Sequence, residues 1–575
     1  MVNDTIGRMS EVYKLAPALP DSFSEQLPEY PAVLKQLLFN RSVTDPDAIT
    51  RFLEPSFDTH LHDPFLLNDM ERAVDRLRTA IAANERILVF SDYDCDGIPG
   101  AVIMHDLLHA VGHTEFVTHI PHRHYDGFGL SVSLIERLID EHAPSLIATI
   151  DCGTSDVEAV NKARERGVDV IITDHHEPKD ALPTAVAIVN PKVGDTYPFT
   201  GLCGAAVVFK LAQALLARGD FPVSPGTEKW WLDMVGIATV ADMVPLLDEN
   251  RVLAQYGLLV LRKSRRPGLQ QLLRAQRVDQ RRLTEDDIGF VIAPRINAAS
   301  RMDTPEDAYI LLTTTDEAEA AARVRHLEQL NTERKTAVGL ITKDIHKRFK
   351  LSVAVPDVIV LGNPEWRPSL VGLAANKLAE EHNRPAFLWG RDGNQQFKGS
   401  CRSNGSVSVV RIMDATPEVF DEYGGHHFSG GFTVTPSYIH TLSEQLQIAY
   451  EALGESAFVK EVHHVDVELT LDEVTKELLA TQQRCAPFGA DNRKPLYLFK
   501  AVSPDGVEVF GKSKNHTKLS FTTRGLAKEA IAFFQLPHQF TREPCVGEQL
   551  SLLAHVEESF FMGRTQIRLR IVDIL

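Results

Sequence analysis

Short apolar runs and helix-like stretches alternate between residues 86 and 174, and this alternation constrains the fold more than any other feature of the chain. The apolar runs are RILVF, EFVTHIP, SLIATI and VDVIITD, and the stretches between them are AVIMHDLLHAVG, SVSLIERLIDEH and DVEAVNKARERG. Strand-like runs separated by segments of helix length are typical of βαβ units. The pattern therefore predicts an α/β domain built on a parallel sheet.

The rest of the chain falls into segments of different character. A mostly helical leader with several prolines is expected over residues 1–85, the parallel-sheet domain over 86–250, and a helical connecting region over 251–350. The stretch DEAEAAARVRHLEQLNTERKTAVGLITKDIHKRF in that region predicts one long helix. A second, smaller α/β domain with a strand at DVIVLG is expected over 351–458, and the many short strands of 459–575 predict a small β-barrel.

Length, charge and cysteine usage bound the class of protein. A chain of 575 residues is long for a single core, which agrees with several domains. The net charge of −18 argues against a generally basic surface, so a polyanionic partner would need a local basic groove or bound cations. The chain begins without a signal-peptide pattern, and no apolar run approaches the roughly 18 residues of a membrane helix, so no membrane association is expected. Six scattered cysteines without a CxxC pair indicate a reducing, cytoplasmic setting.

Acidic residues and histidines follow the ends of three predicted strands, and a further acid lies in ATVADMVPL. The residues are Asp92, Asp94, Asp96, Asp151, Asp174, His175, His176 and Asp242. The carboxyl ends of parallel strands meet at one edge of a sheet, which is where ligands bind. Carboxylates with imidazole and no thiolate suit Mn²⁺ or Mg²⁺. Two such ions, roughly 3.5–4 Å apart, can activate water and stabilise both oxygens of an in-line phosphoryl displacement.

A single Asp after a strand is more often a helix cap or a turn residue than a metal ligand. Three strand ends with the same chemistry favour a metal centre. Asp174 is less suited to be a ligand, because an acid beside a ligating histidine often orients that histidine instead.

The motifs DYDCDG, IDCG, TDHH and ATVADMVPL, in this order, resemble the four motifs of DHH-family phosphoesterases. The resemblance extends to the bacterial single-strand-specific 5′→3′ DNA exonucleases of that family through PHRHYDGFGLS, APRINAASRMD, KGSCRS, GGHHFSGG and APFGADNRKPLYLF. It implies a DHH catalytic domain, a linking helical region, a DHH-associated α/β domain and a C-terminal barrel of the oligonucleotide-binding (OB) type. PEWRPSLVG departs from the family pattern, with Arg367-Pro368-Ser369 in place of His-Gln-Gly.

The resemblance also implies roles for the residues that match these motifs. Two metal ions bridged by Asp151 would be held by Asp94, Asp96, Asp151, His175 and Asp242. Asp92 would be a further acid of the catalytic centre, and His176 would contact the scissile phosphate or protonate the leaving oxygen. Arginine suits phosphate because its planar fork binds two oxygens at once. The implied substrate-binding residues are Arg123, Arg295, Asn297, Arg301, Arg402, Gly425 and His426.

The C-terminal segment contains GVEVFGKS, a literal match to the phosphate-loop pattern. Strand-like sequence on both sides predicts a β-hairpin instead, in which Lys512 and Lys518 could follow a nucleic-acid backbone or simply be solvated. Aromatic side chains of this segment could stack on bases, although packing in the core is the commoner role. They are Phe488, Phe533, Phe534, Phe560 and Phe561. Cys95 and Cys152 depart from the family pattern, and we expect packing roles rather than redox sensitivity.

We therefore expect a cytoplasmic exodeoxyribonuclease with roles in DNA repair and recombination. The resemblance implies 5′→3′ hydrolysis of single-stranded DNA by a monomer that works with single-strand-binding protein and a helicase. Two alternatives stay open. One is a DHH phosphodiesterase that acts on short oligoribonucleotides or cyclic dinucleotides, and the other is a non-catalytic scaffold that binds single strands.

Overall fold

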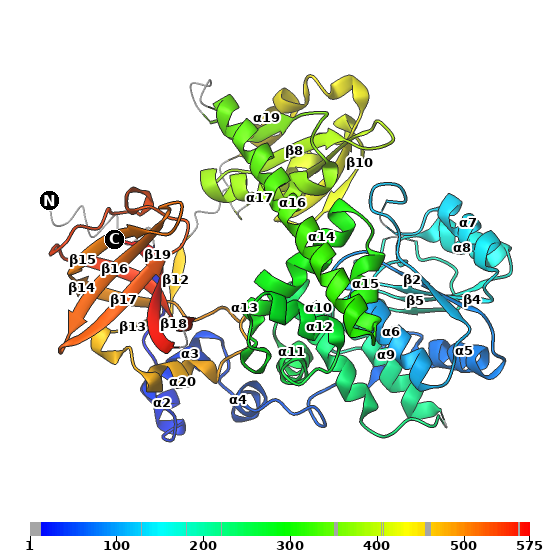
Figure 1. Cartoon of the computed structure of the whole chain (residues 1–575), viewed down its shortest axis with the longest axis horizontal. Coiled ribbons are helices and arrows are strands. Elements are labelled where there is room, and N and C mark those ends of the chain that lie inside the picture. Colours follow the sequence, from blue (N-terminus) through cyan, green and yellow to red (C-terminus); the bar gives the residue numbers. More distant parts are fainter. Residues whose placement is uncertain are drawn as a thin grey trace. The chain divides into compact units, whose positions relative to one another are not determined.

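The computed structural model describes residues 13–575 except 128, 180, 220, 350–354, 404, 406, 455–461 and 562–563 (Figure 1). Its contacts form two compact units. One contains His62–Val244 and Tyr256–Glu461, and the other contains Met1–Leu61, Pro245–Gln255 and Val462–Leu575. The predicted leader 1–85 is thus divided between the units, and the five predicted segments remain a proposal about domains.

The first unit contains the predicted parallel sheet, with strand order β3-β2-β4-β5-β6. Its strands are β2 (Ile87–Ser91), β3 (Phe116–His119), β4 (Leu146–Ile150), β5 (Asp169–Thr173) and β6 (Ala187–Val189). All five residues of β2 and of β4 are buried, because helices cover both faces of the sheet. The prediction missed only β6, whose three-residue run AIV is too short to stand out from its surroundings.

Two groups of helices enclose this sheet. The helices α7 (Val132–His142) and α8 (Val157–Glu165) share a core with β2, β4 and β5. The others are α5 (Met70–Ala82), α6 (Gly97–Ala110), α9 (Gly204–Arg218) and α10 (Leu232–Ala241), and α6 packs against α9 and α10. The α6 and α9 helices begin at the carboxyl edge of the sheet, so their N-termini face the acidic loops.

A helical region leads from this domain to a second sheet. It comprises α11 (Asp248–Leu261), α12 (Pro267–Ala275), α13 (Glu285–Asp287), the π-helix η4 (Ile288–Ile292), α14 (Ala293–Met302), α15 (Glu306–Thr313) and α16 (Glu317–Phe349). The 33 residues of α16 confirm the predicted long helix. It packs against α12 and α14 and also against α17 (Pro368–His382) of the following domain.

The second sheet has the order β10-β11-β9-β8-β7. Its strands are β7 (Ile359–Gly362), β8 (Ala386–Arg391), β9 (Phe397–Arg402), β10 (Phe420–Gly425) and β11 (Ser429–Val434). One core cluster joins it to α16 and α17, and another joins it to α18 (Val409–Asp414) and α19 (Leu442–Ala452). The predicted smaller α/β domain is therefore present.

The second unit is built on a seven-stranded sheet with the order β13-β14-β18-β19-β17-β16-β15. The strands are β13 (Val467–Glu468), β14 (Tyr497–Val502), β15 (Gly506–Phe510), β16 (His516–Thr523), β17 (Leu526–Ala532), β18 (Leu550–Phe561) and β19 (Arg564–Ile574). Within the described residues, the edge strands β13 and β15 do not pair, so the sheet is open rather than a closed barrel. The sequence GKS lies in the turn between β15 and β16, as predicted, and no helix follows it there.

The N-terminal part of the chain belongs to this unit through long-range contacts. The strand β1 (Tyr13–Leu15) pairs in parallel with β12 (His463–Val465). Other helices of this unit include α2 (Asp21–Gln26), α3 (Ala32–Asn40), α4 (Pro46–Leu53) and α20 (Lys476–Gln483). Of these, α3 packs against α20.

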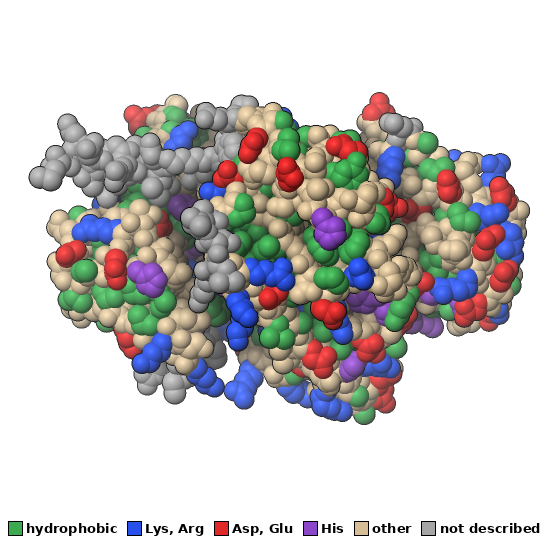
Figure 2. Space-filling model, turned by 90° about the horizontal axis from the view of Figure 1, so that it is seen from above, with side chains coloured by type: hydrophobic (Ala, Val, Ile, Leu, Met, Phe, Trp, Pro, Cys, Tyr) green, Lys and Arg blue, Asp and Glu red, His purple; other side chains and the backbone are tan. Residues whose placement is uncertain are grey.

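One face of the molecule shows how the charged side chains are distributed on it. Figure 2 shows basic and acidic side chains interspersed over the face it displays, rather than gathered into one basic surface. Among the helices that the structure describes, none is long and apolar enough to cross a membrane.

A buried arginine holds three stretches of the second unit together. Arg251 donates to the carbonyl oxygens of Phe52 (2.6 Å), Cys485 (3.0 Å) and Ala486 (3.0 Å), and its guanidinium lies 3.7 Å from the centre of the Phe52 ring. We expect Arg251→Met to lower the free energy of unfolding of this unit by about 3 kcal/mol, because three buried carbonyls lose a charged donor. Calorimetry of the full chain measures this. The exposed Arg281→Met is the control, and an equal loss in both would contradict the assignment.

Candidate active site

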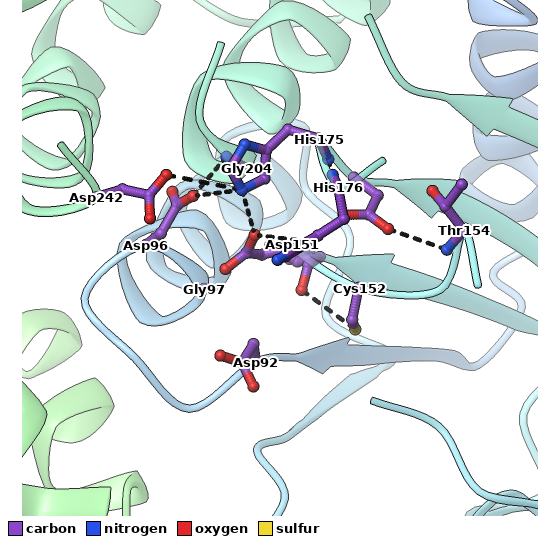
Figure 3. Close-up of polar contacts among 12 residues, drawn as sticks. Asp92, Asp96, Gly97, Asp151, Cys152, Thr154, His175, His176, Gly204 and Asp242 are labelled. Carbon is purple, nitrogen blue, oxygen red and sulfur yellow. Dashed lines mark hydrogen bonds and ion pairs between the residues drawn. The ribbon is translucent and has the colours of Figure 1, made fainter. Parts of the chain in front are cut away.

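The loops after β2, β4 and β5 and the C-terminus of α10 bring the predicted acids and histidines together (Figure 3). Ligand-type atoms of three groups lie within 4.8 Å of one another in each group. The groups are Asp92, Asp94 and Asp151; Asp96, His175 and Asp242; and Asp151, His175 and His176. The structure thus assembles every residue that the sequence analysis assigned to the metal centre.

Hydrogen bonds to Asp96 and Asp94 set the path of the first acidic loop. Asp96 accepts from the amides of Gly204 (2.6 Å) and Ala205 (2.7 Å), which begin α9. Asp94 Oδ1 accepts from the amides of Asp96 (2.8 Å) and Gly97 (3.2 Å), which lie immediately before and at the first residue of α6. The sequence analysis missed the α9 amides, although a Gly before an apolar helical run, as in GLCGAAVVFK, was the available signal.

Two glycines allow the loops to approach so closely. A Cβ on Gly97 would lie 2.4 Å from the carbonyl oxygen of Asp92, and a Cβ on Gly204 would lie 2.6 Å from the Cβ of Asp151. Both distances are shorter than atoms tolerate. Asp151 itself has φ +59°, a left-handed conformation that is strained for a residue other than glycine and typical of functional sites.

His175 lies at the centre of the cluster. Its Nε2 is 3.2 Å from Asp151 Oδ1, 3.6 Å from Asp96 Oδ2 and 3.7 Å from Asp242 Oδ2. Burial, followed by the charge of His176, lowers the pKa of His175 to about 3, so its imidazole is neutral and can act as a ligand. Because Asp151 belongs to the Asp92–Asp94 group and to the histidine group, it lies between two candidate cation positions.

The negative charges of the clustered carboxylates are only partly balanced by positive charges around them. Burial and then mutual repulsion raise the pKa of Asp96 to about 6 and that of Asp242 to about 9. The same causes raise the pKa of Asp92 and Asp151 well above the usual range. One oxygen each of Asp92 and Asp151 is buried without a hydrogen-bond partner among the described residues. A cluster of carboxylate oxygens around one neutral imidazole, with too little positive charge to balance it, fits hard divalent cations.

His176 is held by Asp174 at the side of the cluster. Its Nδ1 is 2.8 Å from Asp174 Oδ1, and Asp174 also accepts from the amides of Thr154 (3.0 Å) and His175 (2.7 Å). Burial opposes ionisation of Asp174, but the bond and charge of His176 outweigh it and lower the Asp174 pKa. For His176, burial is likewise outweighed by Asp174, and its pKa rises to about 9. Asp174 therefore orients His176 rather than offering free oxygens, as expected of an acid beside a ligand.

Three arginines predicted to bind the substrate, Arg123, Arg301 and Arg402, affect one another's pKa near the acids. Arg123 lies 4.8 Å from the centre of the Tyr93 ring, next to Asp92 and Asp94 in the chain. Burial, followed by the positive charges of neighbouring arginines that include Arg123 and Arg402, lowers the pKa of Arg301 to about 9. Burial also lowers the pKa of Arg402, and the charge of Arg123 lowers it further. Such mutual repulsion is relieved when an anion binds between the guanidinium groups.

Two further predicted substrate residues have structural partners. Arg295 is buried and bonds Glu328, Gln276 and the carbonyl oxygen of Val291, so its contacts give phosphate binding no support. Asn297 accepts from the amide of Cys95 at 3.1 Å and thereby holds the acidic loop.

The remaining predicted substrate residues lie outside the acid cluster. Gly425 and His426 are exposed at the β10–β11 hairpin, where the His426 amide donates to Ser429 O at 2.7 Å. Lys512 lies in the turn between β15 and β16, and Lys518 pairs with Glu508 at 2.6 Å.

The two cysteines of the acidic loops are buried thiols. Burial, followed by the charges of neighbouring aspartates, raises the pKa of Cys95 and of Cys152 well above the usual range. A buried, protonated thiol is unreactive, which supports the predicted packing roles.

The fold and the site define a class, the DHH phosphoesterases. Protein-family models match residues 86–239 (DHH family, N-terminal domain), 350–453 (DHHA1 domain) and 465–573 (RecJ OB domain), and the last confirms the predicted OB type for the C-terminal sheet. The chain is 34% identical over 556 residues to the single-stranded-DNA-specific exonuclease RecJ of Bacillus subtilis, covering 96% of this chain and 69% of the relative. It is 30% identical to RecJ of Escherichia coli, covering 82% and 83%.

A solved structure agrees with these relatives. The crystal structure of RecJ in complex with Mn²⁺ from Thermus thermophilus matches with a TM-score of 0.82 and 26% identity, over 98% of this chain and 79% of that chain. The chain belongs to the RecJ family of single-stranded-DNA-specific exonucleases.

The raised carboxyl pKa values predict a metal-dependent stability. Because the pKa of Asp242 rises from 3.8 to about 9 on folding, ionising it costs stability that grows as the pH rises through this range. We therefore expect metal-free Asp242→Asn to melt at a higher temperature than the parent, with a larger difference at pH 8 than at pH 5. Mn²⁺ should raise the melting temperature of the parent more than that of the variant. Differential scanning fluorimetry in EDTA or Mn²⁺ measures this, with the exposed Glu158→Gln as control.

Proposed function

We propose that the chain is a metal-dependent exonuclease that removes nucleotides from single-stranded DNA in the 5′→3′ direction. The observation that carries the proposal is a carboxylate–imidazole cluster at one sheet edge, together with three arginines, Arg123, Arg301 and Arg402, that lie near enough to affect one another's pKa. The relatives named single-stranded-DNA-specific exonuclease support the substrate. The related structure that contains Mn²⁺ supports the cofactor, Mn²⁺ or Mg²⁺. The direction of hydrolysis rests on the resemblance alone.

The residues divide the chemistry among them. Asp94, Asp96, Asp151, His175 and Asp242 would hold the two ions, with Asp151 between them. When bound, divalent ions lower the pKa of water and neutralise charge on a phosphate. The carboxylates alone would repel a phosphodiester, so the cluster cannot bind its substrate without cations. Asp92 adds a further buried acid that Asp151 faces.

His176 is placed to handle a proton. Its pKa of about 9 keeps the imidazole protonated at neutral pH, and Asp174 fixes the ring through Nδ1. A protonated ring in this position can donate a hydrogen bond to a phosphate oxygen or a proton to the leaving oxygen. Arg123, Arg301 and Arg402 would hold the phosphate and set its orientation, because three guanidinium groups that repel one another gain by sharing an anion.

The C-terminal sheet offers a second contact with the strand. Phe534 is 76% exposed and has φ +59°, and its ring lies 4.8 Å from that of His516. The neighbouring Phe533 ring lies 4.3 Å from the Arg570 guanidinium. Exposed aromatic and basic groups of this kind suit base stacking and backbone attraction. Phe488 is in the core, and the side chains of Phe560 and Phe561 lie outside the described residues.

The wider context is also a proposal and rests on family membership. We propose that the protein acts as a cytoplasmic monomer in DNA repair and recombination, with single-strand-binding protein and a helicase as partners. The oligoribonucleotide or cyclic-dinucleotide alternative leaves the OB-type sheet without a role. A non-catalytic scaffold would not need the retained ligand set.

Digestion of end-labelled DNA tests the activity. With Mn²⁺, the parent should release nucleotides from the 5′ end of a single strand and leave a blunt duplex intact. Asp151→Asn should lower the rate at least about 1,000-fold, because Asp151 belongs to two of the three groups that would hold the ions. Glu158→Gln, an exposed acid of α8, should retain full activity. Equal degradation of duplex, release from the 3′ end, or full activity of Asp151→Asn would each contradict the corresponding part of the proposal.

Strand binding by the C-terminal sheet can be measured apart from hydrolysis. In the full-length Asp151→Asn background, Phe534→Ala should weaken single-stranded DNA binding about 5- to 100-fold, the range for loss of one stacked base. Lys512→Ala should reduce the slope of log affinity against log salt by about 0.7. Leu526→Ala is the matched control, because Leu526 is 65% exposed on the same sheet and cannot stack. Equal losses for Phe534→Ala and Leu526→Ala would contradict the stacking role.

A further inference from the structure

The helices α16 and α17 of the first unit end beside each other. The polar residues at their ends are distant in sequence from the acids of the active site and are of a different kind. His346 lies in the last turn of α16, and Glu381 and His382 are the last two residues of α17. The helices share a core that includes Ile341, Ile345 and Leu378, so their ends are held firmly together. The proposed catalytic mechanism gives no role to these three polar side chains.

The three side chains are arranged as metal ligands are. One ligand-type atom from each of His346, Glu381 and His382 lies within 4.8 Å of the other two. His346 Nε2 is 3.1 Å from Glu381 Oε2. His382 Nε2 is buried, and the described part of the chain offers it no hydrogen-bond partner. The Phe349 ring meets that of His382 edge-on at 5.3 Å and restricts its rotation.

The local electrostatics favour a cation here. The C-terminal ends of α16 and α17 each carry a partial negative charge from unsatisfied carbonyl groups. Glu381 adds a full negative charge. A cavity of about 980 Å³ borders the site, and Lys343, Lys347 and Lys377 line it together with both histidines. The positive charge of these lysines opposes a hard cation that would be bound through charge alone. A cation at this site must therefore gain its affinity from bonds to the imidazole nitrogens.

Another cluster in the same unit has suitable ligand atoms, but an arginine already bonds one of its acids. Asp303, Asp307 and His326 also bring ligand-type atoms within 4.8 Å of one another. Arg323 bonds Asp307 there, however, so a protein cation already occupies the position. Among the described residues, no arginine or lysine forms a salt bridge with Glu381, whose ionic partner there is His346.

We propose that His346, Glu381 and His382 form a second kind of metal site, which binds one Zn²⁺ or a similar borderline divalent cation and clasps the end of α16 to the end of α17. Two imidazoles and one carboxylate are a common protein ligand set for zinc. The bordering cavity leaves room for water at the remaining coordination position. The site differs from the active site in its nitrogen-rich ligands, so it selects a different metal from the oxygen-rich cluster.

Elemental analysis of the full-length protein tests this site. Protein is equilibrated with Zn²⁺ in excess Mn²⁺ and freed of unbound metal by gel filtration. The parent should carry one zinc equivalent more than His346→Ala and more than Glu381→Gln. Lys343→Met, which lines the same cavity without supplying a ligand, should retain the parent's zinc. All variants keep the catalytic ligands, so a difference between them reports this site alone.

Two further readouts distinguish a clasp from an ordinary ion pair. Zn²⁺ should raise the melting temperature of the parent and of Lys343→Met by several degrees more than that of Glu381→Gln. Co²⁺ should give the visible absorption of four-coordinate cobalt in the parent and lose it in His346→Ala. Glu381→Gln preserves side-chain shape, so it remains informative if His346→Ala folds poorly. Equal zinc content in the parent and Glu381→Gln, with no difference in melting temperature, would show an ion pair only and overturn the proposal. Zinc content and melting temperature are measured without reference to exonuclease activity, so they test this site even if the nuclease proposal fails. In Mn²⁺ without zinc, exonuclease activity should be the same in all these variants, because none of them changes a catalytic ligand.

Discussion

The hydrogen bonds from the first two amides of α9 to Asp96 are the contact on which the rest of the centre depends. Asp96 is buried among other carboxylates, so its ionised form needs positive charge that these acids cannot supply. The amides of Gly204 and Ala205 provide it from the positive end of the helix. With Asp96 fixed, Asp94 can accept from the amides at the start of α6, and the loop after β2 can lie against Asp151. The starts of α6 and α9 therefore set the path of the acidic loop at the sheet edge.

The site contains two sets of like charges. Asp92, Asp151 and Asp242 have an excess of negative charge, while the arginines repel one another. The position of the arginines depends on the second α/β domain. Arg301 donates to Ser369 O at 2.8 Å, and Ser369 Oγ donates back to Arg301 O at 2.9 Å. Ser369 belongs to Arg367-Pro368-Ser369, the stretch that departs from the family pattern. This chain therefore positions Arg301 with a residue that differs from the one in the family pattern.

The sequence predicted those features that depend on residues close together in the chain. Strand and helix periods predicted β2 to β5 and α16, and strand-end acids predicted the cluster around His175. Contacts between residues distant in sequence could not be predicted. Nothing near Arg295 indicates that Glu328 and Gln276 would bury it, and the motif match alone suggested phosphate. Likewise, only the pairing of β1 with β12 assigns the first part of the leader to the C-terminal sheet.

The helix α17 connects these features mechanically. At its first turn Ser369 bonds Arg301, and at its last residue His382 faces His346 of α16. A helix of 15 residues is a rod of about 22 Å, so a rotation at one end is transmitted to the other. Because α14, which carries Arg301, and α17 both pack against α16, that helix is the common support. A bond between the ends of α16 and α17 would therefore restrict the movement of Arg301. The arrangement of the arginines depends on how tightly these two helices are held together.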